Sequence, residues 1–205
     1  MSFVKREINV TFTLGEGAFG DDGSNTVKLS GLRVSAKIVK AGGPSMSTLQ
    51  MSVYGMDLSQ MNQLSTLGMA PKLVRRNTVL VQAGDAESGM ATVFIGTITN
   101  AWADLQSAPD VPFRVEAHTG LIEAVSVQPP SSYTGATKTS TVMSSLATAM
   151  GLEFENNGVE SVLDAPYFYG SPREQAKACA EAAGCEWIID GTKLAIWPVG
   201  GSRGG

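Results

Sequence analysis

The stretch GLRVSAKIVKAGGPSMSTLQMSVYGMDLSQMNQLS, residues 31–65, decides the fold class. Apolar and polar residues alternate along 25–43 and along 47–56, two segments that overlap this stretch. Alternation with a period of two is typical of strands that bury one face. Residues 57–66 are predicted to form a short helix, because apolar residues recur there at helical spacing behind Asp57, which can cap a helix.

Further strands are predicted on both sides of this stretch. Residues 2–14, 74–84 and 91–105 alternate in the same way. Many short strands joined by glycine-rich turns are typical of a small barrel or a sandwich. We therefore expect residues 1–107 to form one mainly β domain that contains a single short helix.

The rest of the chain changes character, and residues 108–199 are predicted to form an α+β domain with the order helix, strand, helix, hairpin. The first helix is expected over 139–151. Residues 171–174, SPRE, form a capping box with proline at the first helical position and predict the second helix. Asp190-Gly191 lies between two alternating runs and predicts a hairpin with a type I′ turn. The tail 200–205, GGSRGG, has the composition of a flexible linker or of a truncated end.

Composition excludes several classes of protein. A net charge of −4 argues against general nucleic-acid binding, which favours a basic surface. The sequence contains no run of 18 apolar residues, so no membrane span is predicted. Charged residues make up only 17% of the chain, and this low fraction suggests that partners cover part of the surface.

No catalytic, cofactor-binding or metal-binding residue is predicted, and the protein is not expected to be an enzyme. Gly15 to Gly20 match the spacing G-x-G-x-x-G, but a turn and a strand follow where a nucleotide-binding motif needs a helix. His118 is the sole histidine, and no G-x-S-x-G surrounds a serine. Cys179 and Cys185 lack metal-ligand spacing and are expected to be packing residues.

Seven side chains are candidates for contact with a partner: Lys72, Arg75, Arg76, Met51, Met56, Met61 and Trp102. The basic cluster could meet an acidic face, although charges that keep an exposed strand edge soluble would give the same pattern. The methionines could form an adaptable interface or fill a core. The tryptophan could anchor either a core or an interface.

Three segments resemble one known family. They are residues 31–65, VMSSLATAMGLEFENN at 142–157, and SPREQAKACAEAAGCEWIIDGTKLAIWP at 171–198. Together they are similar to baseplate hub proteins of long-tailed bacteriophages, the trimeric tail-hub family that is related to late-control proteins of contractile phages. The resemblance covers most of the chain, but it rests on patterns of strands, helices and turns and not on signature residues.

The resemblance implies a fold and a role. Residues 1–107 would be a tail-tube-like β-barrel domain, and residues 108–199 an α+β hub domain that includes the start of a second barrel. The protein would form a homotrimeric ring that joins the tail tube, or a distal tail protein, to the central spike. It would also meet the tape measure protein, and DNA would pass through the ring only in transit. It would be assembled in the host cytoplasm and reside in the tail baseplate of the virion.

Two other functions remain open at this point. The first is a receptor-binding or carbohydrate-binding module at a tail tip, which would present Trp102, or Tyr133, Tyr167 and Tyr169, as an aromatic platform. The second is an enzyme, either a cell-wall hydrolase or a nucleotide-dependent transferase that uses the glycine loop.

Overall fold

The computed structural model describes residues 5–20, 23–42, 45–66, 76–85, 87–121 and 128–204. These residues form two compact units, each with its own hydrophobic core. Unit 1 takes its residues from 1–39 and 48–118, and unit 2 takes its residues from 40–47 and 119–205. The division therefore falls after His118 and not at residue 107, because the strand that ends at His118 pairs with two strands of unit 1.

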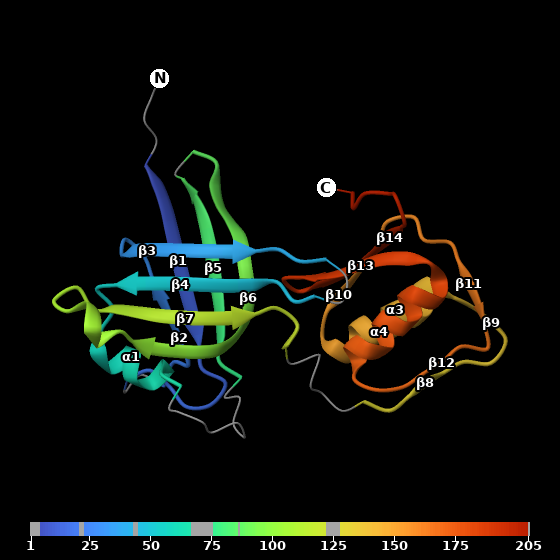
Figure 1. Cartoon of the computed structure of the whole chain (residues 1–205), viewed down its shortest axis with the longest axis horizontal. Coiled ribbons are helices and arrows are strands. Elements are labelled where there is room, and N and C mark those ends of the chain that lie inside the picture. Colours follow the sequence, from blue (N-terminus) through green and yellow to red (C-terminus); the bar gives the residue numbers. More distant parts are fainter. Residues whose placement is uncertain are drawn as a thin grey trace. The chain divides into compact units, whose positions relative to one another are not determined.

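Unit 1 is built on one seven-stranded antiparallel sheet with the order β2-β1-β5-β6-β7-β4-β3 (Figure 1). Its elements are β1 (Arg6–Thr13), β2 (Thr26–Leu29), β3 (Arg33–Val39), β4 (Thr48–Tyr54), α1 (Leu58–Leu64), β5 (Thr78–Asp85), β6 (Gly89–Ala103), the 3-10 turn η1 (Leu105–Ser107) and β7 (Pro112–His118). Buried residues alternate with partly exposed ones along β4 and along parts of β1 and β7, as the period-two pattern predicted.

The expected closed barrel is not formed, because β2 and β3 are the two edges of this sheet and do not pair with each other. These edge strands are consecutive in the chain. Only residues 30–32 lie between them, and Gly31 has φ +72°, a backbone conformation that glycine adopts without strain. The short segment 30–32 therefore connects the two edge strands. A closed barrel would need a ladder of hydrogen bonds between β2 and β3, and the two strands do not form one.

The core of unit 1 lies against one face of this sheet. Phe12 of β1 and Phe113 of β7 are fully buried and make an edge-to-face contact with 6.2 Å between ring centroids. Helix α1 covers part of the core with Met61 and Leu64. Its N-terminus is capped as predicted, since the backbone N–H of Ser59 donates to the carboxylate of Asp57 over 2.9 Å.

Unit 2 is an α+β unit in which helices α3 and α4 pack together and against a three-stranded sheet (Figure 1). Its elements are β8 (Ser131–Ser132), β9 (Ala136–Lys138), α3 (Thr139–Met150), β10 (Glu153–Asn156), β11 (Val162–Asp164), β12 (Tyr167–Phe168), α4 (Pro172–Ala183), β13 (Cys185–Asp190) and β14 (Lys193–Pro198). The main sheet has the order β10-β14-β13, and two short ladders join β11 to β9 and β12 to β8.

The local signals in unit 2 are confirmed, with one shift of register. Ser171 and Glu174 form the reciprocal capping box at the start of α4. The last hairpin is present, but Asp190 pairs with Lys193, so its two loop residues are Gly191 and Thr192. Of these two, only Gly191 has a positive φ, at +62°. This pattern fits a type II′ turn and not the predicted type I′ turn, which needs positive φ at both positions.

The described part of the tail is anchored and does not behave as the predicted free linker. The guanidinium of Arg203 bonds to the carboxylates of Glu155 and Asp190. The backbone N–H of Gly204 donates to the side-chain oxygen of Asn157 over 3.0 Å. The composition of this segment predicts a flexible linker. It does not show that Arg203, the single charged residue of the segment, pairs with two carboxylates from earlier in the chain.

No helix in the described ranges is both long and apolar enough to cross a lipid bilayer.

Candidate functional site

The most suitable surface for contact with a partner lies on the outer face of the sheet in unit 1, around Trp102. In the register of β6, β7 and β4, Trp102 pairs with Arg114, and Arg114 pairs with Ser52. Residues directly opposite on neighbouring strands point to the same face of a sheet. The preceding pair, Ala101 and Val115, is buried in the core, so the row that contains Trp102 faces outward.

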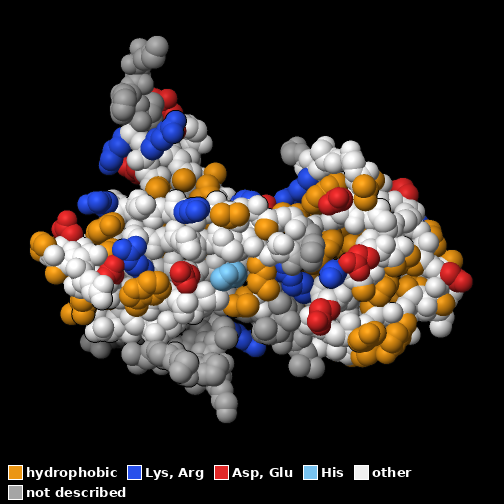
Figure 2. Space-filling model, in the orientation of Figure 1, with side chains coloured by type: hydrophobic (Ala, Val, Ile, Leu, Met, Phe, Trp, Pro, Cys, Tyr) orange, Lys and Arg blue, Asp and Glu red, His pale blue; other side chains and the backbone are white. Residues whose placement is uncertain are grey.

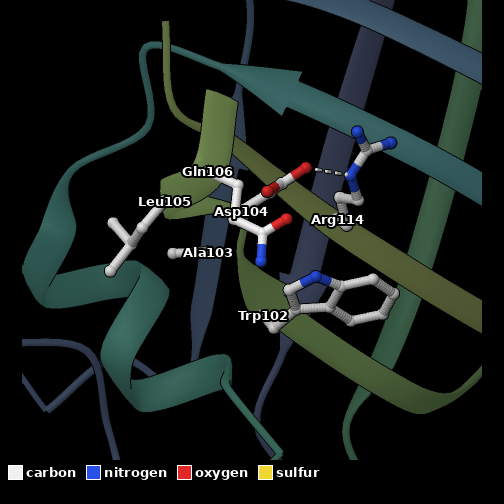
Figure 3. Close-up of a pocket in the computed structure, with 6 residues that line it drawn as sticks. All are labelled: Trp102, Ala103, Asp104, Leu105, Gln106 and Arg114. Atoms are coloured by element: carbon white, nitrogen blue, oxygen red, sulfur yellow. Dashed lines mark hydrogen bonds and ion pairs between the residues drawn. The ribbon is translucent and has the colours of Figure 1, made fainter. Parts of the chain in front are cut away.

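A cavity of about 430 Å³ opens beside this row (Figure 3). It is lined by Trp102, Ala103, Asp104, Leu105, Gln106 and Arg114. Figure 3 shows the indole of Trp102 below the side chains of Gln106 and Arg114, while the side chain of Leu105 extends to the other side. Two large apolar side chains are exposed here, Trp102 at 40% and Leu105 at 68%. These six residues are called the Trp102 surface below.

An ion pair fixes the polar side of the Trp102 surface. The Nε of Arg114 donates to Oδ2 of Asp104 over 2.8 Å, and its Nη1 donates to the hydroxyl of Ser52 over 3.3 Å. The hydroxyl of Ser107 donates to the same oxygen of Asp104 over 3.1 Å. The hydrogen bond from Arg114 is the main reason that the pKa of Asp104 lies below its ordinary value. The side chains of Arg114 and Asp104 are both partly exposed to solvent, so their ion pair adds little to the free energy of unfolding. Its main effect is to hold the guanidinium of Arg114 in place.

The chemistry of this surface suits contact with a partner. Tryptophan and arginine are the residues most often found at the energetic centres of protein interfaces. A nucleophile with an adjacent base is missing from the six residues that line the cavity. In the described part of the chain, no group of three or more His, Cys, Asp or Glu side chains could hold a metal ion.

The predicted contact residues do not come together in one place. Trp102 is exposed as a contact residue should be. Met51, Met56 and Met61 are 3%, 6% and 4% exposed and belong to the core of unit 1, so their assignment to an interface is corrected to core filling. Met51 is buried because alternate residues of β4 face the core, and Met61 because it lies on the inner side of α1. Met56 lies in the segment between these two elements and packs in the same core.

The predicted basic cluster is described only in part. Lys72 and Arg75 lie outside the described residues. Arg76 is exposed and lies against the glycine loop, where a Cβ added to Gly15 would come within 2.9 Å of the Cβ of Arg76. The backbone N–H of Gly15 also donates to the side chain of Asn77 over 3.1 Å. This loop therefore packs against the start of β5 and does not open a helix.

Sequence reasoning missed Asp104, Leu105 and Arg114. The spacing of Asp104 and Arg114 carries no recognisable signal, because the two residues meet only through the register of β6 with β7. Leu105 is the last residue of the strand predicted over 91–105, and its sequence does not distinguish it from a core residue. In the structure β6 ends at Ala103 and Leu105 begins the 3-10 turn η1, which leaves its side chain exposed.

Comparison with known proteins rests on structure alone. No protein-family model matches the chain, and no curated protein matches it in sequence. The fold is similar to prophage tail protein gp18 from Listeria monocytogenes EGD-e, with 12% identity, a TM-score of 0.53 and coverage of 94% of this chain and 50% of that chain. It is similar to the 43 kDa tail protein of prophage MuSo2 from Shewanella oneidensis, with 11% identity, a TM-score of 0.55 and coverage of 95% and 56%.

A third similar structure is a tail protein from Neisseria meningitidis MC58, with 11% identity, a TM-score of 0.58 and coverage of 92% of this chain and 50% of that chain. The chain spans about half the length of these solved structures. At such low identity the likeness concerns the fold and not the activity. The chain has a mainly β fold with an α+β part that is also found in phage tail proteins.

Proposed function

We propose that the protein is a structural, non-enzymatic subunit of a phage tail baseplate hub. The observation that carries this proposal is the likeness of nearly the whole described fold to three phage tail proteins. The exposed and positioned side chains of the Trp102 surface support it, because a subunit of an assembly needs a surface with these properties.

In this proposal the subunit forms a homotrimeric ring. A ring needs a heterologous contact, in which one surface of a subunit meets a different surface of the next. The Trp102 surface supplies one side of that contact. The two sheet edges are less suitable partners for each other, because β2 carries exposed Lys28 and β3 carries exposed Arg33 and Lys37. Like charges on both edges disfavour direct pairing of strands between copies.

The ring would join the tail tube, or a distal tail protein, to the central spike, and it would also meet the tape measure protein. DNA would pass through the ring only in transit. The protein would assemble in the host cytoplasm and remain in the tail of the virion. These partners are carried by the resemblance to tail hubs and by the likeness of the fold, and each is open to direct test.

Light scattering of the purified full chain at micromolar concentration tests the ring. We expect a particle with three times the mass of one chain. Leu105→Asp should reduce it to single chains, because a charge at a desolvated contact costs several kcal/mol. Leu58→Asp is the matched control, since Leu58 is 60% exposed on α1 and lies outside the Trp102 surface. A wild-type chain that stays single, or equal effects of both variants, would count against this contact.

A further inference from the structure

Unit 2 carries an exposed aromatic platform that the proposed role in the hub does not use. Tyr167 and Tyr169 are 60% and 75% exposed, and their ring centroids lie 6.4 Å apart at an interplanar angle of 34°. Phe168 between them is buried in the core of unit 2. Alternate residues of an extended chain point to opposite faces, so the two tyrosines share the outer face by necessity. Patches of hydrophobic side chains are visible over this unit in Figure 2.

The strand beside the platform adds neutral polar groups. Ser132 of β8 pairs with Tyr167, so the two side chains lie on the same face of this short ladder. Its neighbour Ser131 pairs with Phe168 and points toward the inner side, where its hydroxyl donates to the side chain of Gln175 over 2.6 Å. The side chain of Ser132 therefore lies on the same face of the ladder as Tyr167.

A buried glutamine holds this region in a fixed conformation. The Oε1 of Gln175 accepts from the backbone N–H and the hydroxyl of Ser131 over 3.1 Å and 2.6 Å. Its Nε2 donates to the carbonyls of Pro129 and Gly170 over 3.1 Å and 2.9 Å. Gln175 is completely buried. The segment before β8 and the segment after β12 are thus held by one amide, which fixes the platform before any ligand arrives.

A cavity of about 310 Å³ lies beside the same strand. Its lining is aromatic, aliphatic and neutral polar, and consists of Gln128, Pro129, Pro130, Ser131, Ser132, Tyr133, Ser145, Leu146, Ala149 and Gln175. None of these ten side chains is ionisable near neutral pH. The volume lies at the lower end of the range of small-ligand sites, which runs from roughly 300 to 1,000 Å³.

We propose that the platform of Tyr167 and Tyr169, with Ser132 and the adjoining cavity, binds an uncharged saccharide. The apolar C–H face of a sugar ring packs on the face of a tyrosine ring, and hydroxyl and amide groups at the rim satisfy the sugar hydroxyls. An anionic or cationic ligand would need a charged partner, and the cavity lining provides none. The inference is independent of the ring, because it uses only residues of unit 2.

The experiment titrates the full chain with three neutral oligosaccharides, namely chitohexaose, cellohexaose and maltohexaose, and follows binding by isothermal titration calorimetry. We expect at least one of them to bind at millimolar or lower concentration. The double variant Tyr167→Ala/Tyr169→Ala should weaken that binding by about tenfold or more, since each ring contact is worth about a kcal/mol. Tyr167→Phe/Tyr169→Phe should retain most of it, because the ring faces remain.

Val199→Ala is the control, because Val199 is an exposed apolar side chain of unit 2, at 68%, that belongs neither to the platform nor to the cavity lining. It should leave saccharide binding unchanged. Absence of binding by all three sugars overturns the proposal, and so does binding that survives the double alanine variant. A double alanine variant that changes the mass of the assembly and leaves sugar binding intact also overturns it, since the platform would then be a protein interface.

Discussion

Arg203 forms a bidentate ion pair with Glu155 through two hydrogen bonds. The distances are 2.9 Å from Nε to Oε1 and 3.1 Å from Nη2 to Oε2, between residues that lie 48 positions apart in the chain. The remaining guanidinium nitrogen, Nη1, donates to Asp190 over 3.0 Å, and Lys40 donates to the same carboxylate. This arrangement satisfies the planar fork of arginine at two carboxylates and ties residues 200–204 to β10 and β13.

Replacement of Arg203 by Ala should release this segment. We expect faster amide hydrogen exchange over residues 200–204, and unchanged exchange in the sheet of unit 1. The free energy of unfolding should fall by less than about 1 kcal/mol, because both partners are partly solvated. Arg203→Lys should release the segment nearly as much, since an ammonium group cannot make the bidentate contact. Unchanged exchange in the Ala variant would show that the contact does not hold the tail.

Glu155 makes the stability of unit 2 depend on pH. The hydrogen bonds from Arg203 are the main reason that the pKa of Glu155 is lowered from 4.5 to about 2. A carboxylate with a lowered pKa in the folded state adds stability above its ordinary pKa, and this stability is lost as the pH falls toward the folded-state value. We expect Glu155→Gln to lower the thermal midpoint at neutral pH and to match the wild type near pH 2, the folded-state pKa of Glu155.

Thermal unfolding between neutral pH and pH 2 checks this expectation, with Glu153→Gln as the control. Glu153 lies on the same strand, but its contact with Lys193 is 3.8 Å long and its side chain is 69% exposed. Its variant should therefore follow the wild type at every pH. A constant difference between Glu155→Gln and the wild type across the whole range would contradict the assignment.

Ala165 is held in a left-handed conformation and should respond to replacement by glycine. Its φ is +43°, and it is the only described residue other than glycine with a positive φ. We expect Ala165→Gly to raise the free energy of unfolding by up to about 1 kcal/mol, because glycine adopts this conformation without a steric penalty. Ala182→Gly, on the exposed side of α4, should have the opposite sign and cost about 1 kcal/mol. Urea unfolding of both variants measures the difference.

Replacement of Met61 tests whether this side chain fills the core of unit 1 or contacts a partner. Met61 lies on the buried side of α1 and is 4% exposed. Truncation of a buried methionine leaves a cavity, so Met61→Ala should cost about 2–5 kcal/mol in urea unfolding. Leu58→Ala on the exposed side of the same helix should cost less than about 1 kcal/mol. If both variants lower the free energy of unfolding by a similarly small amount, Met61 does not fill the core and is again a candidate for contact with a partner.

Local signals in the sequence predicted local structure well. The capping box at Ser171 and the cap at Asp57 require only neighbours within three positions, and both are formed. The order helix, strand, helix, hairpin also follows from periodicity, and the structure adds only short strands to it. The turn of the last hairpin was displaced by one residue, because one glycine fits either position of a two-residue loop.

Features that depend on pairing between distant strands could not be predicted. The open edges β2 and β3, the place of β7 between β4 and β6, and the contact of Arg114 with Asp104 all follow from register. The sequence shows which residues alternate, but it does not show which strands lie side by side. For the same reason Trp102 was identified as a candidate, whereas the residues that surround it were not.

Electron microscopy of the purified full chain tests the proposed hub most directly. Negatively stained wild-type particles should be closed rings with three-fold symmetry, and Leu105→Asp should abolish them. A field of small solitary particles at concentrations where the wild-type chain is intact and folded would contradict assembly into a ring.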